Sequence, residues 1–151
     1  NRLLSLMAEY GVAPSNLHME VTEDALIEHP ELGLKLLTQL KLAGVKISLD
    51  DFGTGYSSFS YLHKYPLDCL KIDHSFIKTL TNNPDDKTIH LVSAIHALGM
   101  SLGLEMIVEG IETDDQCHCL QNIGFSNGQG YLFAAPNAIE EICNTFKLTS
   151  A

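Results

Sequence analysis

The sequence predicts an α/β fold in which helices pack against a parallel β-sheet. Its 151 residues, of which 45% are hydrophobic and 19% are charged, have the size and apolar fraction of a single globular domain. Short apolar segments with strand periodicity alternate about five times with segments of helical periodicity, at spacings of roughly 20 to 35 residues. This alternation is typical of β-α units. It fits both an open doubly wound sheet and part of a (β/α)8 barrel.

The first third of the chain contains two of the expected strands. Apolar residues within 1–10 share one helical face, and residues 17–22 follow as a short strand. Residues 24–42 are expected to form one helix, because their leucines and isoleucine recur at helical spacing before Gly44. The run 45–49 is expected to be a strand, since its apolar residues alternate between a glycine and two aspartates.

The remainder of the chain repeats this pattern. Residues 59–64 are expected to form a helical turn, and the sequence Asn83-Pro84-Asp85-Asp86 is a start signal for a helix over 87–98. The other strands are expected at 69–72, 104–108 and 130–133, and the other helices at 114–123 and 139–146.

Charge and hydropathy exclude several classes of partner. The formal net charge is −10 and the sequence pI is about 4.9, so the surface as a whole repels DNA, RNA and anionic lipid. A phosphate-bearing ligand would therefore need a local cation. No apolar stretch approaches the roughly 20 residues of a membrane helix, and no signal peptide opens the chain. A cytoplasmic location is expected, and it is compatible with a parent protein tethered to the inner membrane.

The four cysteines do not form a disulfide framework or a zinc motif. Cys69, Cys117, Cys119 and Cys143 lack paired C-x-x-C spacing, which favours a reducing compartment. The run around His118 invites a zinc interpretation, but residues two apart on a helix diverge by about 200°. Core or surface thiols are therefore favoured.

Polar residues collect where the expected strands end. Parallel α/β folds place their functional residues at the carboxyl ends of strands. A lone glutamate such as Glu20 or Glu23 also fits a solvated turn or a helix cap. Asp50 and Asp51 are more informative, because adjacent carboxylates repel each other unless a cation binds them. The candidates at these ends are Glu20, Asp50, Asp51, Lys71, Asp73, Glu109 and Gln129.

A carboxylate-rich set without histidine suits the hard cations Mg²⁺ and Mn²⁺. One aspartate could bridge two metals about 3.5 to 4 Å apart, the arrangement used in phosphoryl displacement. Lys71 would then lie beside anionic phosphate, and Gln129 could hold a base edge or a phosphate oxygen. The next segment has the glycines and hydroxyls of an active-site lid, although a plain turn fits equally well. It comprises Phe52, Gly53, Thr54, Gly55, Tyr56, Ser57 and Ser58.

Five motifs occur in a fixed order along the chain. They are Met19-Glu20-Val21-Thr22-Glu23, then Asp50-Asp51-Phe52-Gly53-Thr54-Gly55-Tyr56-Ser57-Ser58, then Leu70-Lys71-Ile72-Asp73, then Val108-Glu109-Gly110-Ile111-Glu112-Thr113, and finally Gln129-Gly130-Tyr131-Leu132-Phe133 with Pro136. Together they resemble the EAL-domain cyclic di-GMP phosphodiesterases of bacteria. The resemblance covers essentially the whole chain. It implies a partial TIM-type (β/α)8 barrel, with residues 1–151 supplying about the last five β-α units as the C-terminal part of a single EAL domain.

The resemblance also implies an activity, the hydrolysis of cyclic di-GMP to linear pGpG with Mg²⁺ or Mn²⁺. Glu20 and Asp50 look like ligands of a first metal, and Asp50 and Asp51 look like ligands of a second. Glu109 is similar to the acid that coordinates metal or polarises the water nucleophile, and Lys71 to the amine that fixes this water. Gln129 and Asp73 resemble substrate-binding residues.

Further implied roles concern regulation and assembly. The segment 52–58 resembles the loop that couples substrate binding and dimerisation to metal occupancy. Glu23 resembles the residue that anchors this loop, and Glu112 resembles a second supporting acid. The implied partners are cyclic di-GMP, a second copy of the barrel, and upstream sensory or GGDEF-type domains.

Two features of the family are absent from these residues. The Glu-Ala-Leu motif and an asparagine from a further strand would belong to roughly 100 residues before Asn1, together with about three strands. The two-metal site is therefore expected to be incomplete, and the isolated fragment weakly active or inactive. Two alternatives remain. One is a non-catalytic module that binds cyclic di-GMP or a protein, and the other is an unrelated metal-dependent hydrolase or an α/β scaffold.

Overall fold

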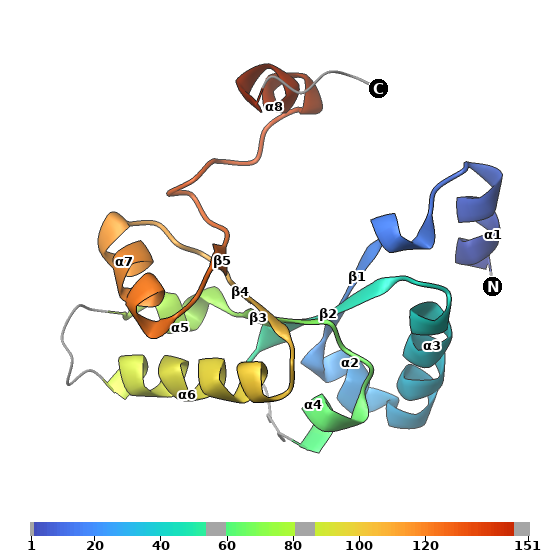
Figure 1. Ribbon diagram of the computed structural model, residues 1–151, viewed down its shortest axis with the longest axis horizontal. Helices are drawn as coiled ribbons and strands as arrows, with labels where there is room; N and C mark the ends of the chain where they lie inside the picture. Colours follow the sequence, from blue (N-terminus) through green and yellow to red (C-terminus); the bar gives the residue numbers. More distant parts are fainter. Residues whose placement is uncertain (1, 54–59, 81–86, 147–151) are drawn as a thin grey trace.

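The computed structural model describes residues 2–53, 60–80 and 87–146, which contain one five-stranded parallel sheet (Figure 1). Its spatial order follows the chain, because each strand pairs in parallel with the next. A doubly wound sheet reverses direction at a switch point, whereas a barrel wall does not. The prediction of a partial barrel is thus confirmed. The strands are β1 (His18–Thr22), β2 (Lys46–Phe52), β3 (Cys69–Ile72), β4 (Glu105–Val108) and β5 (Asn127–Gly128).

Helices follow most of the strands, as a β-α repeat requires. In Figure 1, α2, α3, α4 and α6 lie on the same side of the sheet, and α8 stands apart at the end of an extended segment. No helix in the described part of the chain is long and apolar enough to cross a membrane. The helices are α1 (Arg2–Glu9), the 3-10 turn η1 (Pro14–Asn16), α2 (Glu23–Glu28), α3 (Pro30–Leu42), α4 (Ser60–Lys64), α5 (His74–Lys78), α6 (Lys87–Ser101), α7 (Asp114–Ile123) and α8 (Ile139–Phe146).

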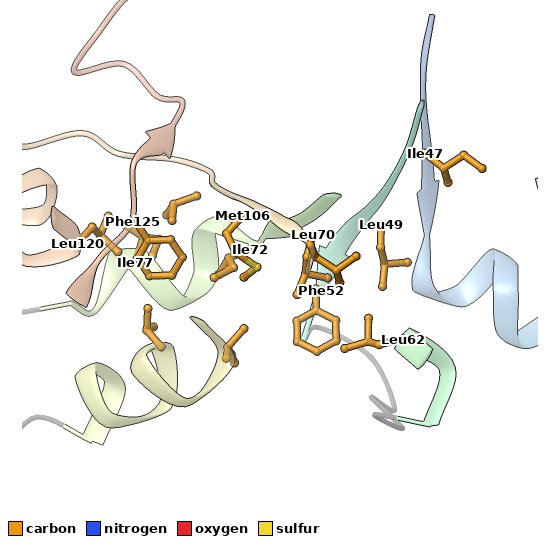
Figure 2. Packing of buried hydrophobic residues seen from close by; sticks show 14 of the residues in the cluster. Ile47, Leu49, Phe52, Leu62, Leu70, Ile72, Ile77, Met106, Leu120 and Phe125 are labelled. Carbon is orange, nitrogen blue, oxygen red and sulfur yellow. The ribbon is translucent and has the colours of Figure 1, made fainter. Parts of the chain in front are cut away.

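The two faces of the sheet differ in character. One row of paired residues is apolar, and Figure 2 shows Leu49, Leu70 and Met106 of this row within the core. The adjacent row on the other face is polar and consists of Glu20, Ser48, Cys69 and Glu105. Since side chains alternate along a strand, the apolar row packs against the helices and the polar row faces the open side. Polar groups at the carboxyl ends therefore project from the open face.

Two predicted elements are wrong, and each error has a local cause. The helix expected over 24–42 is broken at His29, because Pro30 starts a new helix and disfavours helical backbone in the preceding residue. The last strand is Asn127–Gly128 rather than 130–133, where the chain turns instead. At Gly130 an added Cβ would lie 2.1 Å from the Ile111 carbonyl oxygen, so only glycine fits where the chain passes this loop.

Other boundaries shift less. The expected helices at 114–123 and 139–146 and the strand at 69–72 are observed with those limits. The turn expected at 59–64 is α4, and the helix expected from residue 87 extends to Ser101. The start signal at 83–86 lies outside the described residues. Helix α5 was not predicted, and it proves important for the site.

Candidate functional site

The carboxyl end of β2 contains an irregularity that aims two adjacent aspartates at the same place. Leu49 pairs with Leu70 and Phe52 pairs with Ile72, so β2 has one residue more than β3 in this interval. Such a β-bulge locally reverses the alternation of side chains. Asp51 adopts φ 54°, the left-handed conformation that aspartate tolerates better than most residues.

This bulge has a consequence for both neighbours of Asp51. Phe52 returns to the apolar face and is only 3% exposed, so the first residue of the expected lid belongs to the core. Asp50 and Asp51 each offer a carboxylate oxygen to one group with Glu109, in which the three oxygens lie within 4.8 Å of one another. In a regular strand the two aspartates would instead point to opposite faces.

Lys71 is the centre of the charge arrangement. Its Nζ lies 2.8 Å from Glu20 Oε1, 3.0 Å from Asp50 Oδ1 and 2.6 Å from Glu109 Oε1. These carboxylates come from β1, β2 and the end of β4, and β3 brings Lys71 between them. The fold therefore gathers side chains separated by almost ninety residues of sequence at one edge of the sheet.

The charges around Lys71 determine its protonation. The residue is 5% exposed. Burial alone would lower the pKa of Lys71, but the carboxylates of Glu109, Glu20 and Asp50 outweigh burial and raise the pKa above that of an ordinary lysine. The surrounding carboxylates thus favour the protonated form of Lys71, and one ammonium group can balance only one of their negative charges.

The donor set fits a divalent cation. Asp50 Oδ1 is buried, and in the described part of the chain no N–H or O–H donates to it with hydrogen-bond geometry, although Lys71 Nζ is near. A buried oxygen with unused acceptor capacity beside further carboxylates has the chemistry of a ligand for Mg²⁺ or Mn²⁺. The run from Cys117 to Cys119 takes no part in the group of possible ligands found among the described residues.

Gln129 fixes the orientation of Glu109. Its Nε2 donates to Glu109 Oε1 at 2.7 Å, so this oxygen is held by both an amide and the Lys71 ammonium. Backbone hydrogen bonds keep the two residues in register, since Gln129 N donates to Val108 O at 2.8 Å and Glu109 N donates to Ile72 O at 3.0 Å. The short β5 therefore suffices to place Gln129 at the site, although the strand was predicted further along the chain.

An open pocket borders this edge. It has a volume of about 490 Å³, and His74, Glu112, Gln129, Tyr131 and Pro136 contribute to its lining. Volumes of this size are typical of sites for small organic ligands. Gln129 lines this pocket and also donates to Glu109, so the pocket lies beside the carboxylate group.

Asp73 lies next to this edge, but its carboxylate is directed toward α5. Oδ1 accepts from Ser75 N and Oδ2 lies near His74 Nδ1, each at 2.9 Å. Burial would raise the pKa of Asp73, but the bonds from Ser75 and His74 outweigh burial and lower the pKa. A direct contact with substrate would require Asp73 to give up part of this arrangement.

Two of the remaining predicted residues, Glu23 and Glu112, lie shortly after the ends of β1 and β4. Glu23 is buried at the first position of α2, and Glu112 is exposed in the pocket wall, where its N–H donates to Gln116 Oε1 at 2.8 Å. Gly53 ends the described part of the predicted lid, and its residues Thr54, Gly55, Tyr56, Ser57 and Ser58 lie outside the described residues.

Sequence reasoning missed the contribution of α5. His74 lines the pocket, and Phe76 lies against Gly53 beside the aspartates. One signal was available, since an aspartate two residues before a serine is a typical helix N-cap, and Asp73 caps α5 in this way. The five-residue helix is too short for periodicity to reveal it.

Comparison with known proteins gives a consistent result. The EAL domain family matches residues 1–136. MucR from Pseudomonas aeruginosa, a bifunctional diguanylate cyclase/cyclic di-GMP phosphodiesterase, is 43% identical over 136 residues, which are 90% of this chain and 20% of that protein. The PaMucR phosphodiesterase in complex with c-di-GMP superposes with a TM-score of 0.82 at 41% identity, covering 90% of this chain and 54% of that one.

A second solved structure contains a metal as well as the nucleotide. The manganese/cy-diGMP complex of BlrP1 from Klebsiella pneumoniae has a TM-score of 0.80 at 30% identity, covering 89% of this chain and 34% of that one. The chain spans only a fifth of MucR and about half of the solved PaMucR chain. The family match and the solved relatives agree with the fold described above. The chain belongs to the EAL domain family.

Proposed function

We propose that this chain is part of a catalytic EAL domain that hydrolyses cyclic di-GMP to linear pGpG with Mg²⁺ or Mn²⁺. The observation that carries the proposal is the convergence of Glu20, Asp50 and Glu109 on Lys71, at 2.8, 3.0 and 2.6 Å. The PaMucR and BlrP1 structures support it, since both contain the cyclic dinucleotide and the latter contains manganese.

The proposed ligands are the carboxylates at this edge. Glu20 and Asp50 would hold one cation, and Asp50 and Asp51 a second, with Glu109 completing the group. The cations, when bound, would neutralise phosphoryl charge and promote ionisation of the attacking water. The unused acceptor capacity of Asp50 Oδ1 supports this assignment, because a bound cation would satisfy it.

The protein groups would act on the water and the phosphodiester. Since pGpG retains a 5′ phosphate, water adds to phosphorus and the bond from phosphorus to O3′ breaks. The hydroxyl of water joins the phosphate, and the proton that water gives up ends on O3′. We assign Glu109 as the acceptor of the proton from water, held in place by Gln129. Lys71, whose protonated form the carboxylates favour, would stabilise negative charge that develops on the phosphoryl oxygens. The pocket at Glu112 and Tyr131 would receive part of the nucleotide.

The context of the domain is proposed from its relatives. We expect a homodimer in which the 52–58 segment couples assembly to metal occupancy, and an upstream sensory or GGDEF-type domain. The bifunctional description of MucR supports the second expectation. The four free cysteines support action in the reducing cytoplasm.

The test uses the full-length polypeptide that contains this chain. Purified protein is incubated with Mn²⁺ and cyclic di-GMP, and pGpG is quantified by chromatography. Asp50→Asn should reduce Mn²⁺ affinity at least tenfold, and Glu109→Gln should reduce turnover on the order of 10² to 10⁴-fold. Glu9→Gln, which removes an exposed carboxylate from α1, is the control and should behave as the wild type.

Two other results would decide against the proposal. Binding of cyclic di-GMP without any pGpG would indicate a non-catalytic sensor. Equal Mn²⁺ affinity in the wild type and Asp50→Asn would show that Asp50 is not a metal ligand. The alternative of an α/β scaffold without catalytic activity would then be favoured.

A further inference from the structure

Helix α5 lies directly beside the site without contributing a ligand to it. It follows β3, the strand between β2 and β4, and therefore starts between the strand that carries Asp50 and the strand that precedes Glu109. Its third residue contacts Gly53, two residues after Asp51, and its first residue contacts Gly110, directly after Glu109. The two contacts are close enough to exclude a methyl group.

The first contact lies on the side of the aspartates. A Cβ added to Gly53 would lie 2.5 Å from Phe76 Cζ and 2.6 Å from Phe76 Cε2, so the aromatic ring packs directly on the backbone of Gly53. Gly53 has φ +96° and comes two residues after Asp51. The ring therefore supports the point at which the bulged strand ends.

The second contact lies on the side of Glu109. A Cβ added to Gly110 would lie 2.4 Å from His74 Cβ, and Gly110 directly follows Glu109 with φ +71°. Both glycines are in the left-handed region, so both positions combine a special backbone conformation with a close approach of α5. One short helix thus touches the chain next to both parts of the carboxylate group.

Asp73 and the core hold α5 in position. A helix of five residues is not stable alone, so its placement depends on its cap and its packing. Asp73 accepts from Ser75 N at 2.9 Å, and Ile77 is fully buried in the core. These anchors connect the end of β3 to the two glycine contacts.

We propose that α5 is a spacer that sets the distance between the Asp50-Asp51 pair and Glu109, with Phe76 and His74 as its positioning residues. This inference rests on the proposed function, because the geometry it controls is that of the cation site. Sites of this kind tolerate ligand displacements of only about 0.5 Å. A loosened contact at Gly53 therefore weakens cation binding without removing any ligand.

The test compares two Phe→Leu substitutions in the full-length polypeptide. Phe76→Leu shortens the side chain that packs on Gly53. Phe125→Leu is the matched control, because Phe125 is buried and lies outside the site. The centroid of its ring is 4.5 Å from that of His96. Mn²⁺ affinity is measured by titration with electron paramagnetic resonance, and the thermal midpoint is measured in EDTA.

Phe76→Leu should bind Mn²⁺ about tenfold more weakly than the wild type. The Mn²⁺ affinity of Phe125→Leu should stay within twofold of the wild type, even if its thermal midpoint in EDTA falls as much as that of Phe76→Leu. Phe76→Met, which retains most of the side-chain volume, should recover part of the affinity and serves as the test if Phe76→Leu does not fold. The spacer proposal is overturned if a folded Phe76 variant binds Mn²⁺ as tightly as the wild type. It is also overturned if Phe125→Leu loses as much Mn²⁺ affinity as Phe76→Leu. Absence of Mn²⁺ binding in the wild type instead refutes the proposed metal site.

Discussion

At the scale of single residues, the site depends on one aspartate in an unusual conformation. Asp51 at φ 54° introduces the bulge that sends Asp50 and Asp51 toward Glu109. Like charges at this separation repel, and a left-handed backbone costs free energy for most residues. Such a local conflict is expected where function, rather than stability, determines the sequence.

A conservative substitution of Asp51 tests whether charge repulsion at this residue lowers stability. Asp51→Asn keeps a residue that tolerates the left-handed region but removes one charge, so the protein in EDTA should gain roughly 1 kcal/mol in free energy of unfolding. The increase in thermal midpoint on adding Mn²⁺ should shrink, because a ligand is lost. Urea unfolding in EDTA and thermal unfolding with Mn²⁺ measure the two effects. A less stable variant in EDTA would show that repulsion at Asp51 is not significant.

Residue types were more predictable than residue geometry. The order of polar residues at strand ends identified the groups that converge, because parallel strands share one carboxyl edge. The bulge could not be predicted, since an extra residue in one strand becomes visible only once the pairing with Leu70 and Ile72 is known. The engagement of Asp73 with α5 was hidden for a similar reason, because a cap and a ligand carboxylate look identical in sequence.

At the scale of elements, an ion pair joins α3 to the residue before β3. It lies at the amino ends of the strands, opposite the candidate site. Lys41, near the end of α3, binds Asp68 Oδ1, and Ile47 N of β2 donates to Asp68 Oδ2 at 2.9 Å. Burial would raise the pKa of Asp68, but Lys41 and the Ile47 N–H outweigh burial and lower the pKa. The folded state therefore prefers the ionised form of Asp68.

This preference makes stability depend on pH. Since the pKa of Asp68 is lower in the folded state, its contribution is complete above about pH 4 and disappears as the pH falls through the lowered folded value. Asp68→Asn should cost about 1 kcal/mol at pH 7, because the ion pair is partly exposed. The cost should vanish in acid. Urea unfolding from pH 7 to pH 3 tests this, and a cost that is constant with pH would contradict the assignment.

Two glycines in helices should respond oppositely to the same substitution. At Gly99 of α6 an added Cβ would lie 2.0 Å from Met106 Sδ, so Gly99→Ala should destabilise the contact between α6 and β4 by about 1 to 3 kcal/mol. At Gly33 of α3 the nearest atom is 3.4 Å away, so Gly33→Ala should stabilise by up to about 1 kcal/mol. Chemical unfolding measures both, and equal effects would contradict the packing described here.

Most helices and strands were predicted close to their observed positions. Helix 114–123 was located correctly, and its Thr113-Gln116 capping box explains why its start is so well defined. Prediction failed at Pro30, where one apolar pattern continues across two helices, and at β5, whose two residues carry no period. In both cases tertiary contacts or backbone restrictions decide the structure.

At the scale of the whole molecule, the described residues form one parallel sheet, of which one face is polar and uncovered. β1 and β5 are the edges of this sheet, and the row from Glu20 to Glu105 faces the open side. Unpaired strand edges and an uncovered face limit stability and precise placement of ligands. We therefore expect the site to depend on chain that covers this face.

This expectation can be measured directly. Residues 1–151 expressed alone should convert cyclic di-GMP at least 100-fold more slowly than the full-length polypeptide, because the ligand group lacks support on the open face. Circular dichroism would verify that the shorter chain is folded. Mn²⁺-dependent conversion by residues 1–151 at the full-length rate would show that these strands suffice.

The most direct test of the account is to locate the cation. Crystals of the full-length polypeptide are soaked with Mn²⁺, and anomalous diffraction is recorded at the manganese edge. We predict two peaks at roughly 2.0 to 2.4 Å from carboxylate oxygens, one beside Glu20 and Asp50 and the other beside Asp50 and Asp51, with Glu109 next to them, and their loss in Asp50→Asn. Full Mn²⁺ occupancy elsewhere, with no density between these carboxylates, would contradict the central claim that the fold gathers them to hold metal.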